Sequence, residues 1–213
     1  MRFSAALSSI PLALLAVGCA TAHPENPALD AFPPGVAGST DVTYYDVHGT
    51  TARELVADMR RLGPKTETGA SFFGETHSPL RWEWKTRHDG PSCTASDVSV
   101  FIRSEITLPR WTPPSDAPSA LVAQWNQFLA ALETHEIGHK DLSGRAARDV
   151  LTSIRRLNTL CTSFSTEAKR VTDGIVTRLR VEQAGYDAQT RHGVTQGATF
   201  PRRPVTGSVP PPF

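Results

Sequence analysis

Apolar side chains recur every three or four residues from about residue 118 to residue 157, and this stripe restricts the possible folds more than any other feature. The stripe consists of Leu121, Trp125, Phe128, Leu132, His135, His139, Leu142, Ala146, Val150, Ile154 and Leu157. Steps of three and four place these residues on one face of an α-helix. The pattern predicts one long helix with a buried face, and two histidines lie within that face.

Further elements are predicted on both sides of this helix. The stripe breaks at residues 158–165, and a second helical pattern then continues to about Ala184. Thr51 and Glu54 have capping-box spacing and indicate a short helix. Alternating apolar residues predict strands near residues 43–48, 80–87 and 97–107. We expect an α+β fold, a small β-sheet packed on a long helix hairpin, in a domain that spans residues 42–200.

The long helix carries the motif His135-Glu136-x-x-His139. Residues four apart lie on one face, so the two imidazoles can bind one tetrahedral metal ion. Glu136 lies about 100° further round the helix, where it can take a proton from a metal-bound water without binding the metal. Two satisfied core histidines are the alternative, but burying them with a carboxylate and without partners is costly. The motif therefore predicts Zn²⁺ bound by His135 and His139, with Glu136 as general base.

A zinc site of this kind needs a third protein ligand. The long helix continues for about 18 residues, roughly 27 Å, beyond His139. An antiparallel second helix would therefore return to the level of His139 near residue 184, which brings residues 182–193 to the metal. We expect His192 to be the third ligand, with Glu182 and Asp187 as alternatives.

Tyr186 lies in the same returning segment. We expect it to act in catalysis, because its hydroxyl can donate a hydrogen bond to the oxyanion that forms when a carbonyl is attacked. A core tyrosine that caps the helix is the alternative.

The N-terminal residues have the pattern of an export signal. Arg2 precedes an apolar stretch from Ala5 to Val17, and small residues follow. The stretch is too short to span a membrane. The letters AVGC resemble a lipoprotein box, so we expect residues 1–19 to act as a signal peptide and Cys19 to be lipidated. Ordinary cleavage at the ATA sequence that ends at Ala22 is the alternative.

Export determines the expected location and the state of the cysteines. We expect the protein in the periplasm, anchored to the outer membrane through Cys19, or secreted. Cys93 and Cys161 then remain as two cysteines in an oxidising compartment, which predicts a disulfide. Two buried free thiols are the alternative.

Two proline-rich segments flank the expected domain. Residues 20–41 contain four prolines, which predicts a flexible linker. Residues 201–213 are also rich in proline, which predicts a disordered tail. The formal net charge is +1, and no basic patch indicates a nucleic-acid partner. The sequence does not indicate an oligomeric state.

Several blocks of sequence together resemble one bacterial family. They are YYDVHGTTARELVADMRRLGP, RWEWKTR, CTASDVSVFIRSEITLPRW, THEIGH and YDAQTRHG. Their order resembles the bacterial family of predicted secreted zinc-dependent proteases, a domain of unknown function, over about residues 42–200. The resemblance implies a secreted or periplasmic metallopeptidase with His135 and His139 as ligands and Glu136 as base.

The expected function is therefore zinc-dependent hydrolysis of peptide bonds in a peptide or protein substrate of the cell envelope. A zinc amidase that acts on peptidoglycan and a non-catalytic zinc-binding lipoprotein are the alternatives. In zincins, an edge strand above the active-site helix binds extended peptide by strand addition. We expect the strand near residues 97–107 to do so.

Overall fold

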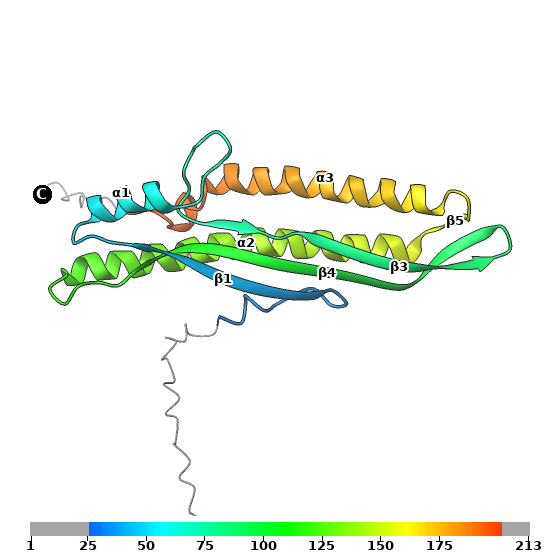
Figure 1. Cartoon of the computed structure of the whole chain (residues 1–213), viewed down its shortest axis with the longest axis horizontal. Coiled ribbons are helices and arrows are strands. Elements are labelled where there is room, and N and C mark those ends of the chain that lie inside the picture. The colour runs from blue at the N-terminus through cyan, green and yellow to red at the C-terminus, as the bar shows by residue number, and fades with distance from the viewer. Residues whose placement is uncertain (1–25, 202–213) are drawn as a thin grey trace, which may run out of the picture.

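One long strand, β4, organises the sheet, because each of the other four strands pairs with it. The structure is a computed structural model, and it describes residues 26–201. Its strands are β1 (Ala37–Val47), β2 (Glu75–His77), β3 (Leu80–Asp89), β4 (Ser92–Trp111) and β5 (Asn158–Leu160). β1 runs parallel to β4, whereas β2, β3 and β5 run antiparallel to it. The result is a mixed five-stranded sheet that extends along the molecule (Figure 1).

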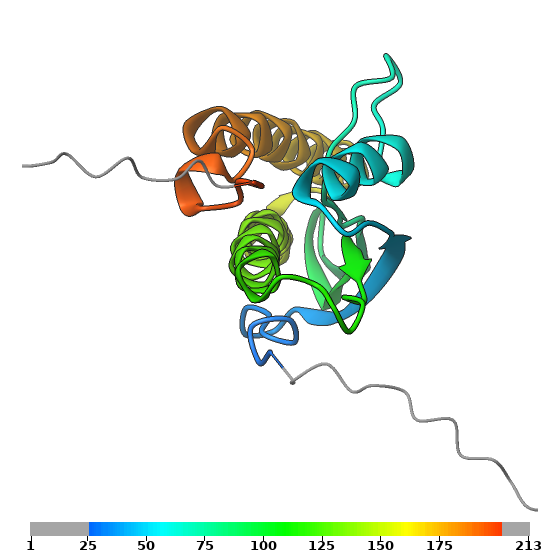
Figure 2. The same cartoon turned by 90° about the vertical axis from the view of Figure 1, so that its left-hand side faces the viewer.

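Two long helices run lengthwise beside this sheet. The helices are α1 (Ala52–Leu62), α2 (Ser119–Arg156) and α3 (Phe164–Thr190), followed by the short 3₁₀ helix η1 (Val194–Gln196). α2 packs along the sheet, and α3 packs beside α2 (Figure 2). No helix in residues 26–201 is long and apolar enough to cross a membrane.

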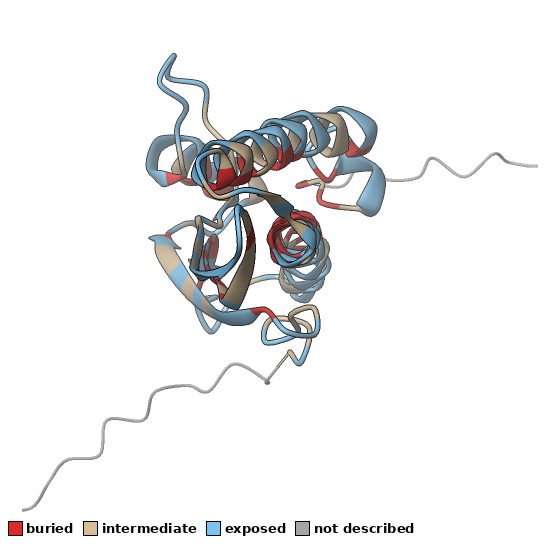
Figure 3. Cartoon of the chain, turned by 90° about the vertical axis from the view of Figure 1, so that its right-hand side faces the viewer, coloured by how far each residue is buried: buried red, intermediate tan, exposed pale blue. Residues whose placement is uncertain are grey.

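The buried residues, coloured red in Figure 3, lie mainly where the helices and the sheet face one another. One core cluster joins Val100 and Ile102 of β4 to Val150 of α2 and Leu179 of α3. A second cluster lies near the start of α2 and includes Phe128, which is fully buried. The predicted apolar stripe is therefore the face of α2 that meets the rest of the core.

The structure confirms the α+β class and the three predicted helices, the last of which ends later than expected. α2 covers the predicted stripe almost residue for residue. α1 begins with the predicted capping box, in which the Thr51 side chain accepts from the Glu54 amide and the Glu54 carboxylate accepts from the Thr51 amide. Two of the amides at this helix start are thereby satisfied by side chains.

The prediction that the two long helices form a hairpin is wrong, because a strand lies in the connection between them. α2 and α3 are not joined by a simple turn, because β5 lies between them and pairs with the first residues of β4. A three-residue strand has too few positions for an alternating pattern to identify it. The end of the helix pair is therefore fixed to the sheet.

The prediction that residues 97–107 form an edge strand, which could bind peptide, is also wrong. Residues 97–107 belong to β4, and residues 105–107 pair with β1 on one side and with β2 on the other. A strand that is paired on both sides has no backbone groups left for an added strand. The short strand β2 lies at the end of the strand order instead.

The sheet begins earlier than the sequence pattern indicates. β1 starts at Ala37, so residues 37–41 belong to the sheet and not to a linker. The preceding residues contact α2, where the buried Lys140 donates from Nζ to the Ala31 carbonyl at 2.7 Å and lies 4.7 Å from the Phe32 ring. The predicted signal peptide with Cys19, and residues 202–213 of the predicted tail, lie outside the described residues.

Cys93 and Cys161 form the predicted disulfide. Cys93 lies at the start of β4 and is fully buried, and Cys161 directly follows β5. The bond therefore holds the turn between the two long helices against the sheet, at the far end of α2 from its N-terminus.

Removal of this bond should lower stability. For a sequence separation of 68 residues, the chain-entropy model gives a loss of about 4 kcal/mol in the free energy of unfolding when both cysteines become alanine. Urea unfolding of the oxidised protein and of the Cys93→Ala/Cys161→Ala variant measures this difference. The reduced parent protein is the control for the lost sulfur atoms, and equal unfolding midpoints for all three samples would contradict the prediction.

Candidate metal centre

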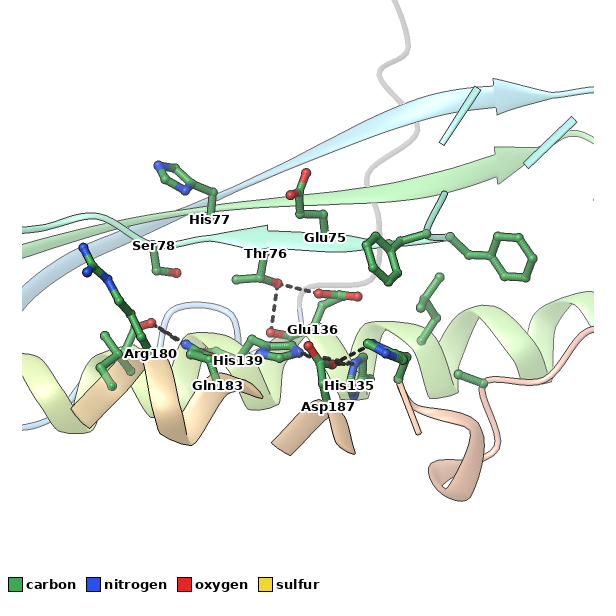
Figure 4. A pocket seen from close by; sticks show the side chains of 18 of the residues that line it. Glu75, Thr76, His77, Ser78, His135, Glu136, His139, Arg180, Gln183 and Asp187 are labelled. Carbon is green, nitrogen blue, oxygen red and sulfur yellow. Dashed lines mark hydrogen bonds and ion pairs between the residues drawn. The ribbon is translucent and has the colours of Figure 1, made fainter. Parts of the chain in front are cut away.

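Two side chains of α2 and one of α3 bring their polar atoms together at the middle of the molecule. The Nε2 atoms of His135 and His139 are 3.3 Å apart. The Asp187 Oδ1 atom lies 3.2 Å from the first nitrogen and 3.1 Å from the second. Figure 4 shows the three side chains converging from the two helices. They form a group that could hold a metal ion.

Both imidazoles are held from behind by glutamine side chains. His135 Nδ1 lies 2.9 Å from Gln196 Oε1, and His139 Nδ1 is hydrogen-bonded to Gln183 Oε1. The opposite end of the Gln183 amide donates to the His139 carbonyl and to Ser143 Oγ, each at 3.0 Å, which fixes the orientation of that amide. Because an amide oxygen only accepts, Nδ1 carries the proton in both neutral rings.

The two Nε2 atoms therefore present lone pairs to each other and to a carboxylate oxygen. Such atoms repel one another unless a cation or a proton lies between them. Their separations are close to the edge of a tetrahedron with zinc–ligand bonds of about 2.0–2.1 Å, which is roughly 3.3–3.4 Å. Burial lowers the pKa of His135 from its ordinary value, which favours the neutral ring that binds metals. The donor set and its spacing fit a small divalent ion.

Glu136 lies beside this group on the adjacent face of α2. It is buried, and Thr76 of β2 donates to its Oε2 at 2.8 Å and to its backbone carbonyl at 3.0 Å. Burial raises the pKa of the Glu136 carboxyl to about 7, and the hydrogen bond from Thr76 opposes that shift. Gly74 approaches Oε1 so closely that a Cβ there would lie 2.7 Å from it. The carboxylate is thus held next to the candidate ligands without joining them.

Tyr186 packs against both histidines. Its ring stacks on the His135 ring at 5.1 Å and meets the His139 ring edge-on at 4.9 Å. Its hydroxyl donates to the His135 carbonyl at 3.3 Å and accepts from Gln196 Nε2 at 3.0 Å. Because the hydroxyl is already bonded to the His135 backbone and to Gln196, the geometry favours a role in positioning the His135 ring over the expected contact with an oxyanion.

The three predicted candidates for a third ligand occupy different places. Asp187 meets the histidines directly, whereas His192 contacts Asp187 with Nδ1 at 3.2 Å and is largely exposed. Glu182 lies near Arg178, at 3.7 Å, on the surface of α3. α3 continues to Thr190, beyond the expected end near residue 184, so Asp187 is still helical where it passes His139. The geometry therefore favours Asp187 over the expected His192.

The predicted site did not include Gln183 and Gln196. A signal for Gln183 exists, because Ile175, Leu179, Gln183 and Asp187 follow one another at steps of four and therefore lie on one face of α3. Gln196 has no such signal, because it lies in η1 after the helix. Its loop approaches His135 at Gly193, which has φ +79° and leaves room only for hydrogen, since a Cβ would lie 3.0 Å from the imidazole.

A cavity of about 980 Å³ opens beside these groups. Residues 71–80, which include β2, form one wall, and the facing sides of α2 and α3 form the other. His135, Glu136, His139 and Asp187 all line it. The candidate metal centre is therefore accessible to a molecule of small-peptide size.

Fold and site together define an α+β protein with a His-Glu-x-x-His cluster on a long helix and a carboxylate from the neighbouring helix. The chain belongs to a family described as bacterial protein of unknown function (DUF922), whose model matches residues 42–193. That range includes the three candidate ligands and Glu136. No curated protein and no solved structure matches the chain.

Substitution of Gly138 should disrupt the site from behind. A Cβ at this position would lie 2.1 Å from the Tyr186 hydroxyl. We expect Gly138→Ala to lower the free energy of unfolding by about 1–3 kcal/mol through overpacking. Gly174→Ala is the matched control, because that helical glycine has nothing within 4 Å of the added Cβ, and alanine there should stabilise by up to about 1 kcal/mol. Chemical denaturation of both variants measures the difference, and similar effects from the two would contradict the assigned packing.

Proposed function

We propose that this protein is a zinc-dependent metallopeptidase of the cell envelope. One observation carries the proposal. The proton-free Nε2 atoms of His135 and His139 and an oxygen of Asp187 converge at 3.1–3.3 Å beside a cavity. Two imidazoles and a carboxylate are ligands that zinc accepts in tetrahedral sites.

The number of ligands favours a catalytic site over a structural one. Structural zinc sites are closed by four protein ligands, whereas catalytic sites use three and keep one position open. Within residues 26–201, this group contains three candidate ligands and borders the cavity. The non-catalytic alternative requires a fourth ligand, and His192 is the nearest candidate because it already contacts Asp187.

When bound, zinc polarises a carbonyl and lowers the pKa of water. The protein supplies the proton transfer. Glu136 takes a proton from the attacking water at a carboxylate oxygen and passes it to the leaving amine. Thr76 holds the carboxylate in place, and Gln183 and Gln196 hold the imidazole rings so that their Nε2 atoms would face a bound ion.

A peptide substrate fits the wall that faces Glu136. β2 pairs with β4 on one side and is last in the strand order, so its other side is available within the described part of the chain. Extended peptides bind such edges through main-chain hydrogen bonds. β2 therefore replaces residues 97–107 as the proposed peptide-binding strand.

A zinc amidase that acts on peptidoglycan is the second candidate, because the same metal chemistry cleaves other amides.

The disulfide supports a place outside the cytoplasm. Disulfides persist in oxidising compartments such as the periplasm, and Cys93 and Cys161 are bonded. We propose that the protein is exported and that Cys19 carries a lipid anchor in the outer membrane.

Zinc should bind at one equivalent per chain. We expect His139→Ala and Asp187→Ala each to lose most of the metal, because each removes one of three ligands. Glu182→Gln is the control and should keep the metal, since Glu182 lies on the surface of α3 near Arg178. Elemental analysis of dialysed protein measures the content. Full occupancy in both ligand variants would rule out this site.

Glu136→Gln should separate metal binding from catalysis. The amide keeps the shape but not the base, so zinc should stay bound while peptide cleavage falls by about 10²–10⁴-fold. Glu133→Gln on the same helix is the control, because Glu133 bonds Asn26 and does not line the cavity. Cleavage of a mixed peptide library, read by mass spectrometry, measures the rate.

An unchanged rate in Glu136→Gln would refute the proposed mechanism. Cleavage of peptidoglycan fragments without cleavage of any peptide would favour the amidase. Zinc binding with neither activity would favour the structural alternative.

A further inference from the structure

The cavity extends along α3 beyond the candidate metal centre, and this extension differs in chemistry from the centre itself. Its walls are mostly apolar: Pro79, Leu80 and Trp82 on the sheet side, and Val176 and Leu179 on α3. Leu80 and Trp82 are only partly buried, so their side chains offer apolar surface to a ligand. We refer to these five residues as the apolar extension.

Arg180 lines the same end of the cavity. It precedes Asp187 by seven residues on α3, which corresponds to about 10.5 Å along the helix axis and nearly the same helix face. Gln183 lies between them and holds His139. In Figure 4, the Arg180 side chain rises from α3 at the Ser78 end of the view, away from His135. Arg180 and the candidate ligand Asp187 therefore lie on nearly the same face of α3, about two turns apart.

Arg180 also differs from its neighbour Arg178 in its contacts. Arg178 donates to Asp149 at 2.8 Å and lies 3.7 Å from Glu182, and it does not line this cavity. Within residues 26–201, Arg180 makes no hydrogen bond or ion pair. An arginine presents five donors in a fixed fork that matches a carboxylate. The exposed Arg180 side chain thus places a guanidinium, without an ion-pair partner among the described residues, at the rim of the apolar extension.

We propose that Arg180 binds a carboxylate of the substrate and that the apolar extension receives an apolar side chain between this carboxylate and the cleaved bond. The inference rests on the proposed peptidase function and defines its substrate class. An extended peptide advances about 3.4 Å per residue. The axial interval of about 10.5 Å between Arg180 and Asp187 on α3 corresponds to about three residues of such a peptide, which is the separation we expect between the carboxylate and the cleaved bond.

Two kinds of carboxylate have this chemistry. One is an aspartate or glutamate side chain within a longer chain, and the other is the C-terminal carboxylate of a short peptide. Both form the same bidentate pair with a guanidinium. The substrate is in either case a peptide with a negative charge and an apolar residue on the same side of the cleaved bond.

Binding to an inactive form tests the proposal separately from cleavage. The protein is the zinc-loaded Glu136→Gln variant, with Arg180 intact or replaced. The probes are short fluorescent peptides with one leucine, in which a glutamate or a glutamine is moved along the chain and the C-terminus is either free or amidated. Fluorescence anisotropy gives each dissociation constant.

With Arg180 intact, we expect one position of the carboxylate to bind about tenfold more tightly than its neutral counterpart, as for a hydrogen bond to a charged group. Arg180→Ala should remove this preference, and Arg180→Glu should reverse it towards a lysine peptide. Arg178→Ala is the matched control and should keep the preference. Val176→Thr should reduce the advantage of leucine over alanine by about fourfold, the value of one buried methylene.

Each outcome distinguishes this inference from the proposed function. A preference that is absent, or that persists in Arg180→Ala, overturns the role of Arg180 while peptide binding and cleavage stand. A preference that depends on Arg180 without cleavage by the active protein supports the binding site and contradicts the peptidase. Failure of every peptide to bind overturns both.

Discussion

The burial of two imidazole rings in the apolar stripe of α2 is the constraint on which the rest of the structure depends. His135 is 3% exposed, so its ring nitrogens have little access to water. Each buried nitrogen requires a partner, because an unpaired polar atom in the core costs free energy. Gln183 of α3 and Gln196 of η1 satisfy the Nδ1 atoms, whereas the Nε2 atoms and the Asp187 oxygen beside them would be satisfied together by the proposed metal ion. These contacts fix the positions of α3 and η1 relative to the two histidines of α2.

The opposite end of the helix pair provides the support for this arrangement. β5 pairs with β4, and the Cys93–Cys161 disulfide joins the same two segments. Both fix the start of α3 against the sheet, and the direction of α3 then determines which of its residues pass the histidines. Close contacts tighten the other end, since the glycine at position 138 admits the Tyr186 hydroxyl against α2. The positions of the candidate ligands therefore depend on β5 and the disulfide, which lie some 25 residues away along α3, or roughly 38 Å of helix.

The sequence allowed the helix and two of the candidate ligands to be predicted, because a period of 3.6 residues is repeated many times along α2. It did not allow β2 or β5 to be predicted, since a strand of three residues contains no periodic signal and forms only because β4 offers a partner. The third candidate ligand depended on where α3 ends. The expected end near residue 184 favoured the loop residue His192, whereas α3 continues to Thr190 and carries Asp187 to the site as a helical residue. Tertiary packing thus decided between candidates that the local sequence left open.

Thr76 connects the proposed peptide-binding strand to the proposed base. It belongs to β2, and its hydroxyl bonds both the carboxylate and the backbone carbonyl of Glu136. β2 is in turn fixed in register by its pairing with residues 105–107 of β4. A peptide that pairs with β2 would therefore be aligned by the same strand that orients Glu136. The distance between a bound carbonyl and the base then depends on one short strand and one hydroxyl, and not on a mobile loop. This coupling is the kind of pre-organised geometry that proton transfer requires, and it gives the three-residue strand β2 a direct part in the proposed site.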